Sequence, residues 1–223
     1  MLKTDDTRDK LLVAALGHVA FDGWGEKALL TAAEETGIGA GAARRAFPRG
    51  AASLIEYHSA WADRCMAEGL AQEALDGLGV RRRVAAAVRI RLRQNEAYRE
   101  AIRAAVAHLA LPHNGLLSLK CLYRTVDTVW FAVGDKSTDF NFYSKRALLA
   151  SAYGATLLYW LDDQSEGREQ SWAFLDRRLE DVVRIGRIRG NIERILPSPG
   201  LLARLFRDGS GRNFAFFRDG RAG

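Results

Sequence analysis

Cysteine and long apolar runs are scarce in this chain of 223 residues, and each scarcity excludes a class of protein. Two cysteines, Cys65 and Cys121, cannot build a disulfide scaffold or a cysteine-rich zinc site, and free thiols suit a reducing compartment. The uncharged run over residues 147–161 is too short and too mixed to span a bilayer. The N-terminus is polar and unlike a secretory signal, so we expect a cytoplasmic protein.

Residue patterns that carry catalysis are also missing. The four histidines, His18, His58, His108 and His113, do not stand at the spacings of metal ligands, and no Glu-x-x-His pair occurs. Neither cysteine has a suitable histidine partner nearby in the sequence, and no glycine-rich motif could cradle a phosphate. We therefore expect a protein that is not an enzyme and that uses no metal and no cofactor.

Positive charge is concentrated at the C-terminal end of the chain. The net charge is +6, and residues 182–223 alone hold nine arginines against three carboxylates. Residues 1–80 hold eight basic and twelve acidic side chains, which gives −4. An anionic surface is therefore a plausible partner for the C-terminal end but not for the N-terminal third.

Only four prolines, with many alanines and leucines at spacings of three and four, predict an all-α chain. The first helix is expected before Gly23, with Leu12, Ala15, Leu16, Val19 and Ala20 in one stripe. Further helices are expected over residues 26–36, 40–47, 53–75, 81–109, 116–133, 139–161 and 166–185. The organisation we expect is a helix-turn-helix-like part over residues 1–50, a helical bundle over residues 51–190 and a basic amphipathic tail over residues 191–223.

Residues 26–54 have the spacing of a helix-turn-helix and resemble the N-terminal domain of TetR-type regulators. The positions that form the scaffold of that domain match: Ala33, Gly37, Ile38, Phe47 and Leu54. The positions that usually contact DNA do not match. In place of the usual serine, threonine, tyrosine and lysine stand Gly39, Ala42, Arg44 and Gly50. With the local charge of −4, this favours a vestigial helix-turn-helix kept for packing over one that binds DNA.

Residues 126–185 resemble the COQ9 family of ubiquinone (coenzyme Q) biosynthesis proteins. The matching elements are Trp130, the run GDKSTDFN at 134–141, Tyr143, KRA at 145–147, LYWL at 158–161 and WAFLDRR at 172–178. About sixty residues agree in order and spacing. The helix-turn-helix part fits as well, because that family has a TetR-like fold, so the resemblance covers roughly residues 8–185.

The resemblance implies a non-enzymatic accessory protein that binds an isoprenoid lipid or quinone intermediate in an apolar cavity. It also implies a partner, the carboxylate-bridged di-iron demethoxyubiquinone hydroxylase, to which the intermediate is presented. The implied contact residues are Asp139, Phe140, Asn141, Phe142 and Tyr143. Phe142 departs from the usual tryptophan, which keeps a ring but loses the indole N–H donor. The alternative for Phe142 and Tyr143 is core packing at a helix start.

A lipid cavity is less evident from the residues themselves. Small residues at Ala147, Ala150, Ser151, Gly154 and Ala155 could open a slot for a prenyl chain, or could let two helices pack closely. With the resemblance we expect a pocket lined by Leu122, Val126, Val129, Trp130, Tyr153, Leu157 and Trp160.

The basic tail combines apolar side chains with arginines. The residues we expect to contact a membrane are Leu201, Leu202, Arg204, Leu205, Phe206 and Arg207. Bulky apolar side chains flanked by cations suit an anionic bilayer surface. A disordered tail, or one docked on its own chain, is the alternative.

The sequence thus predicts a lipid-binding, TetR-like accessory protein of ubiquinone biosynthesis, attached peripherally to the inner (cytoplasmic) membrane and dimeric with itself. A TetR-type transcriptional regulator with a small-molecule pocket is the first alternative. A dimerisation protein with a tightly packed core is the second.

Overall fold

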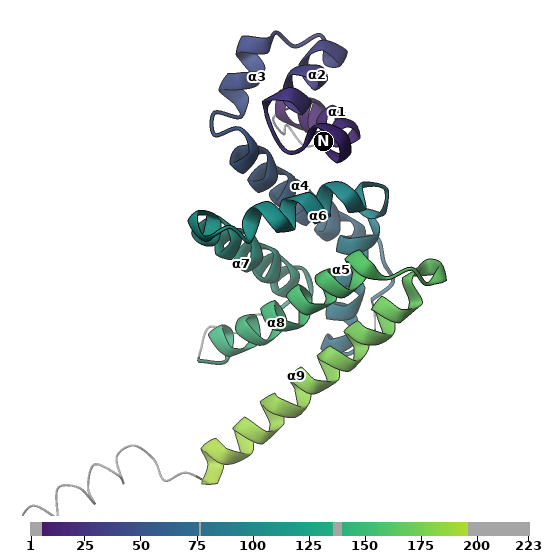
Figure 1. Ribbon diagram of the computed structural model, residues 1–223. Coiled ribbons are helices and arrows are strands. Elements are labelled where there is room, and N and C mark those ends of the chain that lie inside the picture. The colour runs from purple at the N-terminus through teal and green to yellow at the C-terminus, as the bar shows by residue number, and fades with distance from the viewer. Residues whose placement is uncertain (1–5, 76, 136–139, 196–223) are drawn as a thin grey trace, which may run out of the picture. The chain divides into compact units, whose positions relative to one another are not determined.

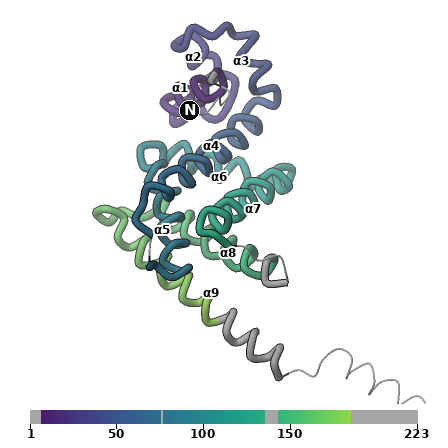
Figure 2. Tube along the Cα trace, turned by 180° about the vertical axis from the view of Figure 1, so that it is seen from behind, coloured from purple at the N-terminus to yellow at the C-terminus, as the bar shows by residue number. Residues whose placement is uncertain are grey.

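The computed structural model describes residues 6–75, 77–135 and 140–195, with the backbone alone for residues 6, 140–142 and 185–195. Every regular element within these ranges is helical (Figures 1 and 2). The α-helices are α1 (Asp6–Asp22), α2 (Glu26–Thr36), α3 (Ala40–Ala46), α4 (Ala51–Ala71), α5 (Val80–Arg93), α6 (Arg99–Leu109), α7 (Gly115–Ala132), α8 (Phe140–Asp162) and α9 (Glu169–Ile195). Short 3-10 turns are η1 (Glu96–Tyr98), η2 (Pro112–Asn114) and η3 (Glu166–Arg168).

Contacts divide the chain into two units, Met1–Val182 and Val183–Gly223, so the boundary lies within α9. The boundaries predicted at residues 50 and 190 stay predictions. Among the described helices, none is long and apolar enough to cross a membrane. The all-helical class predicted from the sequence is confirmed for the part of the chain that the structure covers.

The helix-turn-helix part has an apolar core of its own within the first unit. Leucines and a valine of α1 pack there against the inner faces of α2 and α3. Phe47 and Leu54, two of the predicted scaffold positions, are fully enclosed. The turn between α2 and α3 needs Gly37, whose φ of +69° favours a residue without Cβ. Trp24 Nε1 donates to the Ala101 carbonyl of α6 at 2.7 Å, which fastens this part to the next.

A second apolar core joins α4, α5, α7, α8 and the start of α9. Its members are buried aliphatic and aromatic side chains such as Met66, Val88, Val129, Leu149 and Leu175. In Figures 1 and 2, α7 lies beside both α4 and α8, and the contacts between these helices agree. The apolar faces of these helices therefore pack against one another in a shared interior.

The single helix predicted over residues 81–109 is wrong, because α5 ends at Arg93 and α6 begins at Arg99. The buried side chain of Asn95 lies at the break. Its Nδ2 donates to the Arg91 carbonyl at 2.8 Å and its Oδ1 accepts from His58 Nε2 at 3.0 Å. The hydrogen bond from His58 of α4 holds the Asn95 side chain in place, and α5 ends there. As a result, α5 packs in the second core, while Ala101 and Ala105 of α6 pack in the first.

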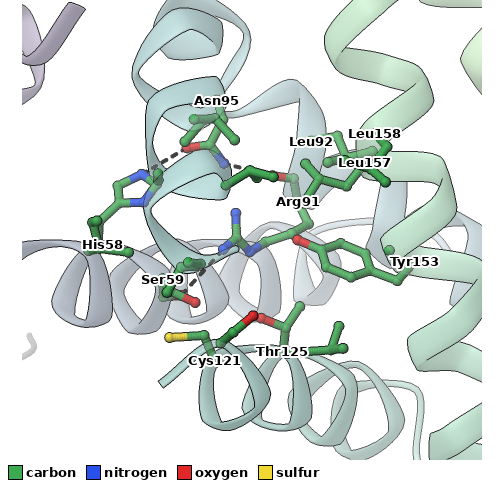
Figure 3. Close-up of a pocket in the computed structure, with 18 of the residues that line it drawn as sticks. His58, Ser59, Arg91, Leu92, Asn95, Cys121, Thr125, Tyr153, Leu157 and Leu158 are labelled. Atoms are coloured by element: carbon green, nitrogen blue, oxygen red, sulfur yellow. Dashed lines mark hydrogen bonds between the residues drawn. The ribbon is translucent and has the colours of Figure 1, made fainter. Parts of the chain in front are cut away.

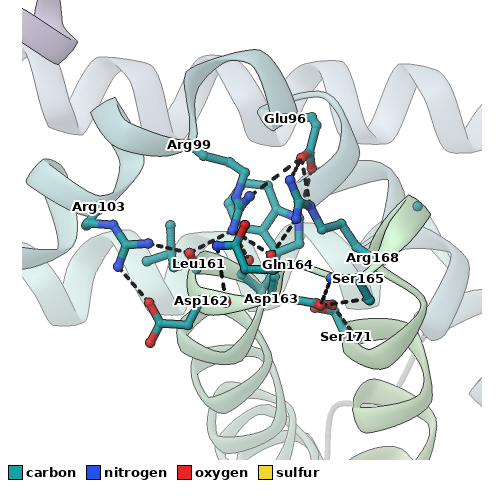
Figure 4. A network of polar contacts seen from close by, with 12 residues as sticks. Glu96, Arg99, Arg103, Leu161, Asp162, Asp163, Gln164, Ser165, Arg168 and Ser171 are labelled. Atoms are coloured by element: carbon teal, nitrogen blue, oxygen red, sulfur yellow. Dashed lines mark hydrogen bonds and ion pairs between the residues drawn. The ribbon is translucent and has the colours of Figure 1, made fainter.

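The end of α8 is held by a polar network that reaches across to α6 (Figure 4). Arg99 Nη2 donates to the carbonyls of Trp160, Leu161 and Asp163 at 2.9, 2.7 and 3.0 Å. Arg103 also donates to the Leu161 carbonyl. The last carbonyls of a helix have no hydrogen-bond donor inside the helix, so the two arginines supply donors for them. Their positive charges also interact favourably with the negative C-terminal end of the helix dipole.

Candidate functional site

A cavity of about 290 Å³ lies inside the first unit, between α4, α5, α6, α7 and α8 (Figure 3). Its volume is at the lower end of the range of about 300–1,000 Å³ that is usual for small-molecule sites. The helices that surround it begin at Ala51 and end at Asp162, so segments far apart in sequence form one site.

One wall of the cavity is apolar. It is built by α6 and α8, which contribute Ile102, Val106, Leu109, Leu157 and Leu158. Leu158 is 55% exposed although it lines the cavity, which indicates that the opening lies beside α8. This wall is suited to a prenyl or acyl chain.

The opposite wall carries a buried ion pair. Arg91 Nε donates to Asp63 Oδ1 at 2.9 Å, and both side chains are buried. Thr125 Oγ1 donates to the same oxygen at 2.8 Å, and Arg124 Nε lies 3.2 Å from Asp63 Oδ2. Asp63 is therefore held by donors from α5 and α7, and its single negative charge is shared by two arginines, Arg91 and Arg124.

His58 is a neutral side chain with a defined tautomer. Burial and the nearby Arg91 cation together lower its pKa to about 3. Asn95 Nδ2 donates to the Arg91 carbonyl, so Asn95 Oδ1 must be the acceptor of the contact with His58 Nε2. The proton of the imidazole therefore sits on Nε2. Within the described ranges, no group of three His, Cys, Asp or Glu side chains could hold a metal ion.

Two further side chains at the cavity remain protonated at neutral pH. Burial raises the pKa of the Tyr153 hydroxyl and of the Cys121 thiol. Tyr153 extends from α8, and its hydroxyl points toward the Arg91 guanidinium (Figure 3). The polar wall thus offers mainly hydrogen-bond donors.

Four of the seven residues predicted for the lipid pocket line this cavity: Leu122, Tyr153, Leu157 and Trp160. The other three, Val126, Val129 and Trp130, are buried in the second core and do not line it. All seven come from α7 and α8, and their role in lipid binding stays a prediction.

Sequence reasoning missed the polar wall, including His58, Arg91 and Asn95. One signal was present for Arg91. It stands between Val88 and Leu92, on the side of α5 that the apolar spacing points inward.

The residues predicted to contact a partner lie at the start of α8. Asp139 and the side chains of Phe140, Asn141 and Phe142 lie outside the described residues. Tyr143 is 69% exposed, so core packing does not apply to it. The predicted membrane residues 201, 202 and 204–207 also lie outside the described part. Both sets stay predictions.

In a regulator, the surface of α3 would contact DNA. In this chain, one arginine of α3 is paired with a carboxylate of α2. Arg44 Nε donates to Glu26 Oε1 of α2 at 2.7 Å, and both side chains are exposed. Arg49, which follows α3, pairs with Glu56 of α4. The prediction that the helix-turn-helix serves packing and not DNA binding stays a prediction.

Known proteins resemble this chain in sequence and in fold. Residues 116–186 match the COQ9 family model. The mitochondrial ubiquinone biosynthesis protein COQ9 of Drosophila melanogaster is 33% identical over 190 residues, which are 82% of this chain and 57% of that protein. The protein of the same name from Homo sapiens is 33% identical over 189 residues, 82% of this chain and 59% of that protein. The chain thus spans less than two thirds of the length of these relatives.

A solved structure shares the fold. The TetR transcriptional regulator from Nitrosomonas europaea superposes with a TM-score of 0.64 at 23% identity, over 80% of this chain and 99% of that chain. This identity shows the fold alone, and it confirms the predicted TetR-like class. The sequence matches show that the chain belongs to the COQ9 family of ubiquinone biosynthesis proteins, and its fold is TetR-like.

Proposed function

We propose that this chain acts in ubiquinone biosynthesis as a lipid-binding accessory protein. In this proposal it takes the tail of an isoprenoid quinone intermediate into the cavity and presents the quinone to the di-iron demethoxyubiquinone hydroxylase. The observation that carries the proposal is the partly apolar cavity whose α7 and α8 walls fall within the residues that match COQ9. The work is done by burial and contact, without a covalent step.

The proposed contact with the hydroxylase involves residues 139–143. The exposure of Tyr143 supports this assignment, because an exposed aromatic side chain can anchor an interface. We propose further that the protein is a homodimer and that it works at the cytoplasmic face of the inner membrane.

A cavity-filling variant tests the lipid proposal. Gly154 lines the cavity, and no atom lies within 4 Å of the Cβ that a side chain would add there. Gly154→Leu should therefore leave the fold intact and reduce the co-purified isoprenoid lipid by about tenfold or more, the equivalent of 1–3 kcal/mol of overpacking. The measurement is native mass spectrometry with lipid extraction.

The matched control is Gly17→Leu in α1, where a Cβ also meets nothing within 4 Å and which lies outside the cavity. It should retain the lipid. Equal lipid in the Gly154→Leu and wild-type proteins would contradict the cavity assignment and direct attention to the tail.

The proposed membrane contact is tested separately in the full chain. Each arginine close to an anionic bilayer contributes about 1 kcal/mol, so replacing Arg204 and Arg207 with glutamine should weaken vesicle binding by roughly thirty-fold. Sedimentation with vesicles rich in phosphatidylglycerol measures this. Replacing Arg44 and Arg45 with glutamine is the control and should have little effect. If both pairs weaken binding equally, the tail is not the specific contact.

A DNA-binding regulator remains the alternative function, and the TetR-like fold is the observation that favours it. A DNA-binding regulator should retain duplex DNA in a salt-dependent way, and substitutions in α3 should abolish this retention. The proposal predicts no such retention, since the residues that usually contact DNA are replaced in this sequence.

A further inference from the structure

A second pocket, with a volume of about 280 Å³, lies where the helix-turn-helix part meets the helical bundle. Three arginines from three elements line it. Arg8 comes from α1, Arg49 from the turn between α3 and α4, and Arg124 from α7. Between them lies the face of α4 that carries Glu56 and Tyr57. No residue lines both this pocket and the cavity between α4 and α8, so the two are separate places in the fold.

Glu56 is the one carboxylate among the described residues that line the pocket, and two cations share it. Arg49 Nη2 donates to Glu56 Oε2, and Lys120 Nζ lies 2.5 Å from Glu56 Oε1. The hydrogen bonds and charges of Lys120 and Arg49 lower the pKa of Glu56, so this side chain is ionised at neutral pH. Its single negative charge faces two positive charges, which leaves one cation in excess.

The arginine on the α7 side of the pocket also shares its carboxylate. Arg124 Nε lies 3.2 Å from Asp63 Oδ2, while Asp63 Oδ1 accepts from the buried Arg91 at 2.9 Å. Arg124 Nη2 donates to the Glu56 backbone carbonyl at 3.0 Å, and the Arg124 side chain is only 28% exposed. A cation that is largely withdrawn from water and holds a shared counterion is unfavourable. An anion in the pocket offsets this cost.

The remaining charged groups around the pocket are held by its α1 side. The guanidinium of Arg8 stacks on the Tyr57 ring, with Cζ 4.1 Å from the ring centroid. The Tyr57 hydroxyl donates to Asp9 Oδ1 at 2.7 Å, and Arg64 Nη2 donates to the same oxygen at 3.1 Å. Asp9 is therefore engaged by Tyr57 and by a cation of its own.

We propose that this pocket binds the phosphate group of a phosphate monoester, with Arg49 and Arg124 as the side chains that hold it. Glu56 and Asp63 together carry two negative charges against four cations, an excess of two without Arg8. A phosphate monoester carries about −1.5 to −2 charge at pH 7, which matches this excess better than the single charge of a carboxylate. The planar fork of a guanidinium also fits two phosphate oxygens.

Bound phosphate links the turn before α4 to α7, since its two arginines come from these two places. The inference goes beyond the proposed function, because the pocket is separate from the cavity and binds a different chemical class. The phosphate group can belong to a small soluble molecule or to a lipid head group, and the experiment below distinguishes these two sources.

The test is calorimetric titration of the full-length protein with glycerol 3-phosphate and, for comparison, with acetate. Wild-type protein should bind glycerol 3-phosphate at least tenfold more tightly than acetate, because the second negative charge meets a second cation. Arg49→Gln should weaken phosphate binding by about tenfold, which corresponds to one hydrogen bond to a charged group. Arg49 is 62% exposed and Glu56 keeps Lys120 as its partner, so this variant should fold normally.

Two further variants separate a phosphate contact from damage to the fold and from general charge. Glu56→Gln removes the carboxylate that competes for Arg49, so phosphate binding should become about threefold to fivefold tighter. Damage to the fold does not raise affinity. Arg45→Gln removes the same charge from an exposed residue of α3 that does not line the pocket, and it should bind glycerol 3-phosphate like the wild type.

Sedimentation with phosphatidylcholine vesicles that contain or lack phosphatidate identifies the source of the phosphate. Binding to phosphatidate vesicles that falls in Arg49→Gln, without binding of glycerol 3-phosphate, supports the pocket and makes a lipid head group its ligand. Binding of glycerol 3-phosphate that falls in this variant supports a soluble ligand. The proposal is wrong if neither probe distinguishes Arg49→Gln from Arg45→Gln. It is also wrong if duplex DNA alone binds in a way that depends on Arg49, because the contact is then with a nucleic-acid backbone.

Discussion

Asp63→Asn is expected to lower the free energy of unfolding by about 3–5 kcal/mol, the range for removing one partner of a buried ion pair. The carboxylate accepts from Arg91 at 2.9 Å and from Thr125 at 2.8 Å, and Arg124 lies 3.2 Å away. An amide carries no charge, so Arg91 would be left as a buried cation without a counterion. Because α4, α5 and α7 all contribute, the loss affects the interior that surrounds the cavity. Urea unfolding followed by circular dichroism measures it.

Two comparisons identify the cause. Asp176→Asn removes a half-exposed carboxylate whose Oδ2 lies 2.6 Å from Arg89 Nη2, and such exposed pairs contribute about 0–1 kcal/mol. The double variant with Asp63→Leu and Arg91→Met replaces the whole pair by apolar side chains and should recover most of the stability. An Asp63→Asn protein within 1 kcal/mol of the wild type would show that the pair is not needed to hold these helices together.

Asp163→Asn is expected to cost about 3 kcal/mol at neutral pH, because it removes charge-assisted hydrogen bonds to buried donors. Asp163 Oδ1 accepts from Ser165 N at 2.8 Å and Oγ at 2.6 Å, and Oδ2 accepts from Ser171 N at 2.8 Å and Oγ at 2.5 Å (Figure 4). The carboxylate therefore fixes the turn from α8 into α9. An amide has one acceptor oxygen, and its NH2 group would face donors instead.

The same carboxylate makes stability depend on pH. Hydrogen bonds from Ser165 and Ser171 outweigh burial and hold the pKa of Asp163 far below its usual range. The unfolded carboxyl titrates near 3.9, so this stabilisation is present in full above that pH and is lost as the pH falls toward the folded pKa. The difference in unfolding free energy between wild type and Asp163→Asn should therefore shrink between about pH 5 and pH 3.

The neighbouring residue provides the control for this prediction. Asp162 is exposed, and its Oδ1 lies 2.8 Å from Arg103 Nη1. Asp162→Asn should change stability by less than about 1 kcal/mol. An Asp163→Asn protein whose stability follows the pH in parallel with the wild type would overturn the assignment of the acid-sensitive component to Asp163.

The sequence alone determined the helical class, the helix-turn-helix scaffold and the relationship to COQ9. Apolar side chains recur at three and four residues, and this local period predicts an inward face for each helix regardless of what packs against it. Phe47 and Leu54 are buried as the scaffold pattern requires. Leu122, Tyr153, Leu157 and Trp160 line a cavity because they lie on inward faces of α7 and α8.

Only the tertiary structure decided where the inward faces of the helices enclose a cavity and where they pack without one. Leu122 and Val126 are successive members of one helical stripe, yet one lines the cavity and the other is enclosed in the core, because the neighbours of α7 change along its length. The break at Asn95 depends on His58, 37 residues earlier in the chain, and no local pattern reports such a partner. The Arg91–Asp63 pair joins two helices in the same way. Periodicity fixes which side of a helix faces inward, whereas contacts between helices decide which charges are balanced there and which donors remain for a ligand.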